Sequence, residues 1–387
     1  MIYLNNFVCI SSIGTTVDEH IKSISTNTNH FSATSKLLPQ GMEAFFGIIH
    51  EELPEISEKY YDCRTNRLIE YCLNNIEEEI KKCVSIYGKN RIGVVVGTST
   101  GAIYDVENNV RENYKVEDET LDFDQRVYDI GLNSSYIKEK YNLEGPCYTI
   151  ATACTSSARA LISAKNLVDC GLCDVVIVAG VDSISTVSAS GFYALGALSD
   201  KPCTPFAKDR TGITIGEACG ITLLSKDKLD NEALSFLGFG ASTDGHHVSA
   251  PEPSGVFAVQ AMEDALRMAN LSIDDIGYLN AHGTGTVLND DMEYNAIKSL
   301  FGNKVKVSSS KHLSGHTLGA AGIFEAYIAK LILKHNCPLP YDVYDEGDLE
   351  QYKDISLVVN KNEFIEKNIV MTNNFAFGGN NTSLIFA

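Results

Sequence analysis

The chain has 387 residues, a length that allows one large core or two fused domains. Of these residues 44% are hydrophobic and 21% charged, which is ordinary for a globular protein. Its formal net charge of −19 argues against a general nucleic-acid binder, because phosphate binding requires a basic surface. No run approaches the roughly 20 apolar residues of a membrane-spanning helix, and residues 1–14 lack the pattern of a signal peptide. We therefore expect a cytoplasmic protein without a membrane span.

The predicted elements indicate an α/β fold, because short runs rich in Val and Ile alternate with amphipathic segments. Residues 1–14 are predicted to contain the first strand. Further strands are expected at residues 92–96, 175–179, 276–280 and 357–359. Helices are expected at residues 67–83, 156–168, 256–268 and 319–333.

The sequence contains an internal repeat. In each half an amphipathic helix precedes a short strand and then a loop rich in Gly and Thr, at residues 67–101 and again at 256–286. Farther along, each half has a second strand that leads into a helix start built from small residues. We therefore predict two related α/β halves that meet near residue 230, one spanning residues 1–230 and the other residues 231–387.

Cys154 follows a strand-like run and precedes a helix start made of small residues. A thiol at a helix N-terminus experiences free N–H groups and the positive end of the helix dipole, both of which favour the thiolate. This pattern makes Cys154 a candidate nucleophile. The alternative is a buried cysteine that serves only as a small hydrophobic residue.

The other cysteines predict reduced thiols, because the total of eleven is odd and no framework spacing is visible. Cys170 and Cys173 form a CxxC pair, which could indicate redox chemistry or a zinc site. No second Cys or His pair stands at zinc-ligand spacing. We interpret the pair as a turn between a helix and a strand.

Two histidines stand in related glycine-rich loops of the C-terminal half. His282 follows the strand at 276–280, and His316 follows Lys311 in the run 311–322. Active sites gather at the carboxyl ends of strands in α/β folds, and two neutral imidazoles can donate to one developing oxyanion. Both are therefore candidate site residues. His246 and His247 form a weaker pair, for which a solvated turn is favoured over a metal site.

Lys311 and Glu325 are predicted to form a buried ion pair. Lys311 precedes His316 by five residues, and Glu325 lies inside an apolar helical segment, so each charge needs a partner if it is buried. Exposed, unrelated charges are the alternative. Residues 373–381 are expected to form a Gly/Asn turn between two strands, with Phe375 and Phe377 just before Gly378 and Gly379.

Five runs of sequence resemble the elongating β-ketoacyl-acyl carrier protein synthases of the I/II class, which have the thiolase fold. These runs are TACTS at 152–156, NAHGTGT at 280–286, KHLSGHTLGAAG at 311–322, NFAFGGNN at 374–381, and the weaker match at 205–217. The resemblance extends over nearly the whole chain. It implies a duplicated thiolase-like fold with two related α/β halves in α-β-α-β-α layers.

The resemblance also implies a role for each matched residue. Cys154 would carry the acyl group, and the backbone N–H groups of Cys154 and Phe377 would form the oxyanion hole. His282 and His316 would bind the malonyl thioester and stabilise the enolate released on decarboxylation. The remaining implied residues are the supporting pair Lys311 and Glu325, the structural carboxylate Glu293, the gate residue Phe377, and the pocket residues Phe375, Gly378 and Gly379.

For partners, the resemblance implies an acidic acyl carrier protein whose phosphopantetheine arm holds the substrates, with no metal or other cofactor. Basic residues at Arg64, Arg67 and Lys201 match positions at which the family contacts this carrier. A homodimer is expected, with a heterodimer containing a related subunit as the alternative.

Three departures from the family pattern concern substrate range, namely Ala207, Cys219 and Ala376. Fatty acid, polyketide and polyene pathways all remain open. A thiolase acting on coenzyme A esters would need a second cysteine in the run 373–381, and a chain-length-shaping subunit would lack Cys154. An initiating enzyme of the type III class would have Asn where this chain has His316.

Overall fold

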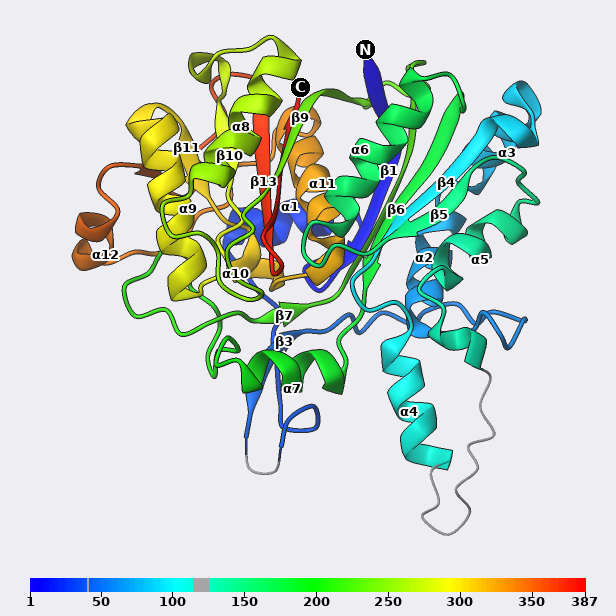
Figure 1. Ribbon diagram of the computed structural model, residues 1–387, viewed down its shortest axis with the longest axis horizontal. Coiled ribbons are helices and arrows are strands. Elements are labelled where there is room, and N and C mark those ends of the chain that lie inside the picture. The colour runs from blue at the N-terminus through cyan, green and yellow to red at the C-terminus, as the bar shows by residue number, and fades with distance from the viewer. Residues whose placement is uncertain (40–41, 114–124) are drawn as a thin grey trace.

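The computed structural model describes residues 1–39, 42–113 and 125–387 (Figure 1). Its main feature is a sheet whose strands follow the order β12-β11-β10-β13-β14-β9-β1-β8-β6-β4-β5. A small second sheet has the order β2-β3-β7. The mixed α/β architecture predicted from the alternating pattern is confirmed.

The first part of the chain supplies one side of the large sheet and the whole of the small one. Its strands are β1 (Ile2–Ser11), β2 (Ser32–Thr34), β3 (Ala44–Gly47), β4 (Ile92–Gly97), β5 (Cys147–Ile150), β6 (Val175–Asp182), β7 (Ile215–Gly216) and β8 (Ala218–Ser225). Its α-helices are α1 (Val17–Thr26), α2 (Arg64–Asn74), α3 (Glu77–Tyr87), α4 (Ile103–Asn113), α5 (Leu132–Lys140), α6 (Ser156–Asp169) and α7 (Thr186–Ala194).

The second part supplies the other side of the large sheet. Its strands are β9 (Leu234–Thr243), β10 (Tyr278–Asn280), β11 (Lys306–Ser308), β12 (Ser356–Leu357), β13 (Val370–Ala376) and β14 (Asn380–Phe386). Its α-helices are α8 (Val256–Ala269), α9 (Val287–Leu300), α10 (Lys311–Ser314), α11 (Ala321–Lys334) and α12 (Glu346–Gln351). The expected meeting point near residue 230 falls in the connection between β8 and β9.

The two sides of the large sheet repeat one topology. Strand β4 is parallel to β5 and β6, β6 is antiparallel to β8, and β8 is antiparallel to β1. The same relations connect β10 with β11 and β13, β13 with β14, and β14 with β9. The sides join where β1 pairs with β9, between Ile2–Leu4 and residues 234–236. The predicted duplication is therefore present as a repeated strand order.

Helices cover both faces of this sheet in layers (Figure 1). Helices α6 and α11 contact each other and pack between the two sides, α6 on β4 and β6, and α11 on β8 and β13. On the outer faces, α2 packs on β6 and β8, and α8 packs on β9 and β14. Because helices cover both faces of the sheet, every residue of β4, β6 and β8 is buried. Such burial on both faces favours the nearly continuous apolar runs of these strands.

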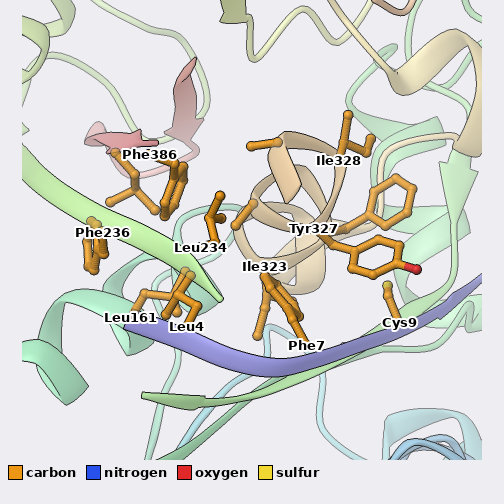
Figure 2. Close-up of a cluster of buried hydrophobic side chains, with 14 of the residues drawn as sticks. Leu4, Phe7, Cys9, Leu161, Leu234, Phe236, Ile323, Tyr327, Ile328 and Phe386 are labelled. Carbon is orange, nitrogen blue, oxygen red and sulfur yellow. The ribbon is translucent and has the colours of Figure 1, made fainter. Parts of the chain in front are cut away.

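The central layer contains the principal hydrophobic core (Figure 2). Side chains of β1, such as Leu4 and Phe7, meet Ile323 and Tyr327 of α11 there. Helix α11 is buried on every side from residue 321 to 332, so it lacks a polar face. Its high content of Ile, Leu and Ala follows from that position.

Two predicted helices differ from the structure. The expected helix at 67–83 is divided into α2 and α3, because the backbone turns at Ile76 (φ −133°, ψ 20°) and buries this side chain. Glu77, Glu78 and Glu79 then occupy the first turn of α3, where they complement the helix dipole. The helix expected from residue 319 begins as the 3₁₀ turn Leu318–Ala320, and α11 follows it.

Within the described ranges, none of the helices combines the length and the apolar character needed to cross a bilayer.

Replacing Ile328 with alanine is expected to destabilise the fold strongly, because Ile328 is fully buried in the central layer (Figure 2). Truncation of such a side chain costs about 2–5 kcal/mol of unfolding free energy through lost burial and a residual cavity. Chemical denaturation of Ile328→Ala against the parent chain measures this loss. Val343→Ala is the control, because Val343 is exposed. Equal losses in both variants would contradict the layered core.

Candidate active site

Cys154 lies at the tight turn between β5 and α6. Ala153 adopts a left-handed conformation (φ 50°), which is costly for a residue with a side chain, and Thr155 is the N-cap of α6. Hydrogen bonds from the Thr152 N–H to Ser156 Oγ (2.9 Å) and from Ser156 Oγ to the Ala153 carbonyl (2.6 Å) hold the turn. The thiol is thus held in one place at the start of a central helix.

The two predicted histidines approach this thiol from the other half of the chain. His316 Nε2 lies 2.9 Å from Cys154 Sγ, and the rings of His282 and His316 have centroids 5.2 Å apart at an angle of 85°. All three side chains are buried. The structure therefore brings together the three candidate residues predicted from the sequence. His282 and His316 follow Cys154 by 128 and 162 positions.

Lys311 and Glu325 form the predicted buried ion pair, with Lys311 Nζ 2.6 Å from Glu325 Oε1. Asn374 Nδ2 donates to the other carboxylate oxygen at 2.7 Å. Lys311 Nζ also lies 3.4 Å from His282 Nδ1. Because an ammonium group can only donate, His282 Nδ1 must accept, and its remaining proton is on Nε2. His282 is therefore held as an Nε2–H donor.

His316 has a different hydrogen-bonding environment. Its Nε2 contacts the thiol, and its buried Nδ1 has no partner among the described residues. No neighbouring group therefore selects one tautomer of this ring. His316 can accept the thiol proton in one tautomer and donate from Nε2 in the other.

Glu293 and Asp290, on α9, hold the loop that carries His282. Glu293 accepts from the His282 N–H at 2.8 Å and the Gly283 N–H at 2.7 Å, and Asp290 accepts from the Thr284 N–H at 3.0 Å. Burial raises the pKa of Glu293 to about 7, against these donors. The expected structural carboxylate Glu293 is thus in contact with the site.

The titration of the site differs from the sequence-based expectation of a thiolate. Burial raises the pKa of Cys154 to about 12, although Lys311 and the backbone N–H groups of Cys154 and Phe377 act to lower it. Burial also lowers the pKa of His282 and of His316 well below 6.5, and the Lys311 charge adds to this effect. The resting site therefore holds a protonated thiol and two neutral imidazoles. The effect of desolvation on the pKa of the thiol is therefore larger than the opposite effect of the helix N-terminus.

The donor atoms of the same three side chains lie within 4.8 Å of one another, close enough to hold a metal ion. They are the only such group among the residues that the structure describes. Only after loss of the thiol proton would Cys154 and the two imidazoles form a donor set of the kind that binds Zn²⁺. His246 and His247 are exposed in a loop, as is Cys170 at the end of α6. All eleven cysteines are free thiols.

Comparison with known proteins agrees with this geometry. The family model "Beta-ketoacyl synthase, N-terminal domain" matches residues 53–229, and "Beta-ketoacyl synthase, C-terminal domain" matches residues 235–341. The chain belongs to the β-ketoacyl synthase family. The predicted resemblance is confirmed at the level of the family.

Individual relatives extend this result. The chain is 34% identical to 3-oxoacyl-(acyl-carrier-protein) synthase 2 of Rhizobium meliloti, over 66% of this chain and 64% of that protein. It is 32% identical to the mitochondrial 3-oxoacyl-(acyl-carrier-protein) synthase of Arabidopsis thaliana, over 77% of this chain and 69% of that protein. The first match thus spans less than two thirds of the relative.

A solved structure matches over the full length. It is a ketosynthase from Xenorhabdus doucetiae in complex with its chain length factor, with a TM-score of 0.91, 36% identity, and coverage of 100% of this chain and 97% of that one. The thiolase-like layered fold expected from the motifs is therefore confirmed.

A cleft of about 410 Å³ leads to the three reactive side chains of this ketosynthase fold. Its lining includes Phe375 and Ala376 at the end of β13 and Phe377 directly after it. The centroid of the Phe377 ring lies 5.7 Å from that of Phe192 on α7. Phe377 is partly exposed at 37%, as a residue between the cleft and solvent must be. Phe192 is a lining residue that the sequence analysis missed.

Gly378 and Gly379 were expected in the pocket, but they form the turn beyond it and do not line the cleft. Both have left-handed φ angles (84° and 76°), which the tight β13–β14 turn requires. Ala376, the departure from the family pattern, pairs with Asn380 within the hairpin. Its methyl group therefore does not strain the turn, whose unusual dihedral angles occur only at the two glycines.

The three predicted carrier contacts each have a carboxylate partner within the chain. Arg64 binds the buried Glu217 through Nε and Nη2 (2.7 and 2.6 Å). Arg67 Nε lies 2.6 Å from Asp62, and Lys201 Nζ lies 2.8 Å from Asp209. Of the three, Arg67 and Lys201 have the more exposed side chains, at 34% and 41%.

Asp182 is the main site residue that the sequence analysis missed. It ends β6, is fully buried, and raises the pKa of Cys154 through its negative charge. A signal was available, because an aspartate directly after an apolar strand stands at the edge of the sheet where active sites gather. Asp290 gave a similar signal, since it precedes Glu293 by three residues on one helix face.

The reaction of Cys154 with iodoacetamide is expected to rise about tenfold per pH unit from pH 7 to 10, because a pKa of about 12 leaves the thiolate a minor species throughout. Mass spectrometry of the peptide containing Cys154 measures this rate separately from the exposed Cys170. A plateau below pH 8 would show that the resting site holds a thiolate.

Proposed function

We propose that this protein is a β-ketoacyl synthase that joins acyl units by decarboxylative Claisen condensation. The observation that carries this proposal is the convergence of Cys154, His282 and His316 at the end of one cleft. A buried thiol and two neutral imidazoles suit a reaction that needs an acyl acceptor and hydrogen-bond donors but no strong base.

In the first half-reaction, Cys154 Sγ attacks the carbonyl carbon of an acyl thioester. The thiol proton moves to His316 Nε2, which lies 2.9 Å away, and then to the departing thiolate. The backbone N–H groups of Cys154 and Phe377 act on the sulfur and are suited to stabilise the adjacent oxyanion. The product is an acyl group on Cys154 and a free pantetheine thiol.

In the second half-reaction, His282 and His316 donate from Nε2 to the carbonyl oxygen of a malonyl thioester. The bond to the carboxylate breaks, CO₂ departs, and its electron pair forms an enolate. The enolate carbon attacks the acyl carbon, the bond from this carbon to Cys154 Sγ breaks, and the released thiolate takes up one proton from solvent. Lys311 supports this step by holding the His282 tautomer, and Glu325 balances its charge.

The proposed substrates are carried on the phosphopantetheine arm of an acyl carrier protein, and the names of the two relatives above specify an acyl carrier protein for those enzymes. Arg67 and Lys201 are the proposed contacts for the acidic carrier. Arg64 instead holds Glu217, which also accepts from the Ile49 N–H at 3.0 Å. Phe377 is the proposed gate between the acyl and malonyl sides, with Phe375 beside it.

A heterodimer is favoured over a homodimer by one observation. The solved ketosynthase at 36% identity, which matches over the full chain, was determined in complex with its chain length factor. This chain retains Cys154, so it corresponds to the catalytic member of such a pair. We further propose that it needs no cofactor beyond the carrier-bound arm and acts in the cytoplasm, where its free thiols remain reduced.

A thiolase acting on coenzyme A esters is the second candidate function. It would need a second cysteine near the nucleophile, and Cys154 is the one cysteine among the residues that line the cleft. The combination of His282, His316 and Lys311 also favours decarboxylative condensation.

Incubation with an acyl-carrier substrate is expected to add one acyl group to the protein, on Cys154. Intact mass spectrometry measures the adduct, and Cys154→Ala is expected to show none. Cys203→Ala is the matched control, because Cys203 is also buried but lies outside the cleft lining. An adduct that persists in Cys154→Ala would place the nucleophile elsewhere.

His282→Ala is expected to lower the rate of condensation about 10²–10³-fold, the usual effect of removing one oxyanion donor. Acylation of Cys154 is expected to be retained, because His282 acts on the malonyl side. Rates of CO₂ release and of acyl-adduct formation separate the two half-reactions. His246→Ala is the control, since His246 is exposed and outside the cleft lining. Unchanged condensation in His282→Ala would refute the assigned role.

A further inference from the structure

We propose that Asp182 is a positioning residue that holds the turn after His316, and the loop after β4, in place around Cys154. The inference rests on the proposed function in one respect, because one of its tests measures acylation of Cys154. A second test measures alkylation of the thiol and needs no substrate, so a failure of this inference can be distinguished from a failure of the proposed function.

Asp182 collects hydrogen bonds from two segments distant in the sequence. The loop after β4 donates through Thr98 Oγ1 (2.7 Å), the Ser99 N–H (2.9 Å), and both the N–H (2.9 Å) and Oγ1 (2.8 Å) of Thr100. The Gly319 N–H, from the 3₁₀ turn before α11, donates at 2.6 Å. One carboxylate thus connects both halves of the fold beside the nucleophile.

These partners indicate that Asp182 is ionised. The backbone N–H groups can only donate, and Thr98 Oγ1 already accepts from the Gly101 N–H at 3.0 Å, so its own proton is directed at the carboxylate. Burial raises the pKa of Asp182, although these hydrogen bonds act to lower it. Among the residues that the structure describes, its hydrogen-bond partners are backbone N–H groups and threonine hydroxyls, whose dipoles stabilise the charge.

The bond to Gly319 controls the segment that carries His316. Leu318, between the two, has a left-handed φ of 51°, a conformation that a leucine adopts only when its surroundings enforce it. A Cβ at position 319 would lie 2.6 Å from Asp182 Oδ2 and 2.5 Å from the Ser99 nitrogen, so only glycine allows this approach. On the other side, the His316 N–H donates to the Thr214 carbonyl. The segment is thus held at the His316 N–H and again three residues later at Gly319.

Asp182 also acts on Cys154 through its charge. Lys311 lowers the pKa of the thiol and Asp182 raises it, so the two buried charges act in opposite directions on the same sulfur. Removing the charge of Asp182 should therefore lower the pKa of the thiol and make Cys154 more reactive. Removing a residue that only stabilised the fold would not be expected to increase this reactivity, and this difference provides the test.

The experiment compares three variants with the parent chain. Asp182→Asn keeps the shape but removes the charge and places an NH₂ group against N–H donors. Thr100→Val removes one hydroxyl donor at a half-buried position and leaves the carboxylate in place. Asp348→Asn is the matched control, because Asp348, on α12, is a buried carboxylate that accepts the Lys208 and Asp345 N–H groups and does not line the cleft.

For Asp182→Asn we expect acylation of Cys154 to slow about 10–100-fold, as for a displaced catalytic group. We also expect its alkylation by iodoacetamide at pH 9 to accelerate about threefold or more, since the loss of a nearby negative charge lowers the pKa of the thiol. Thr100→Val is expected to slow acylation about threefold or more without faster alkylation. Asp348→Asn is expected to change neither rate.

Acylation within about twofold of the parent in folded Asp182→Asn would overturn the proposal, as would slower alkylation of Cys154. If Asp182→Asn does not fold by circular dichroism, Thr100→Val decides the matter, and unchanged acylation in that variant would refute the positioning role. Loss of acylation in the parent chain itself would instead contradict the proposed function.

Discussion

The close packing of α6 on α11 is the contact on which the site depends. Cys154 precedes α6, His316 precedes α11, and the two helices belong to different halves of a duplicated sheet. Gly322 permits the approach, because a Cβ there would lie 2.5 Å from the Ala158 nitrogen. A larger residue would separate the helix starts and with them the thiol and the imidazole. The small residues around Cys154 therefore allow the two helices to pack closely and also leave room for a substrate.

Burial determines the charge state of the site. Desolvation raises the pKa of the thiol and lowers the pKa of both imidazoles, while Lys311 and Glu325 lie buried as an ion pair with a third partner in Asn374. A neutral donor site suits chemistry in which the departing CO₂ generates the carbanion. Charge then develops only in the transition state, where fixed donors are most effective.

Carboxylates without a direct chemical role hold the reactive loops. Glu293 and Asp290 bind the backbone around His282, and Asp182 binds the backbone after His316. Each half thus supplies buried acid groups that accept N–H groups and fix one of the two histidine-bearing loops. Such acids explain how glycine-rich loops, flexible by composition, can present histidines in fixed orientations.

The sequence by itself determined the family and the alternation of helices and strands, and it predicted Cys154, His282, His316 and the Lys311–Glu325 pair as candidates that the fold brings together. These follow from local patterns, because periodicity, glycine-rich loops and motif spacing are properties of neighbouring residues. It also predicted that the two halves meet near residue 230.

Only the tertiary structure decided that the thiol is protonated, that α2 and α3 are separate helices, and that Asp182 reaches Gly319 across 137 positions. Desolvation and long-range hydrogen bonds depend on every element packed around a group, so no local pattern contains them.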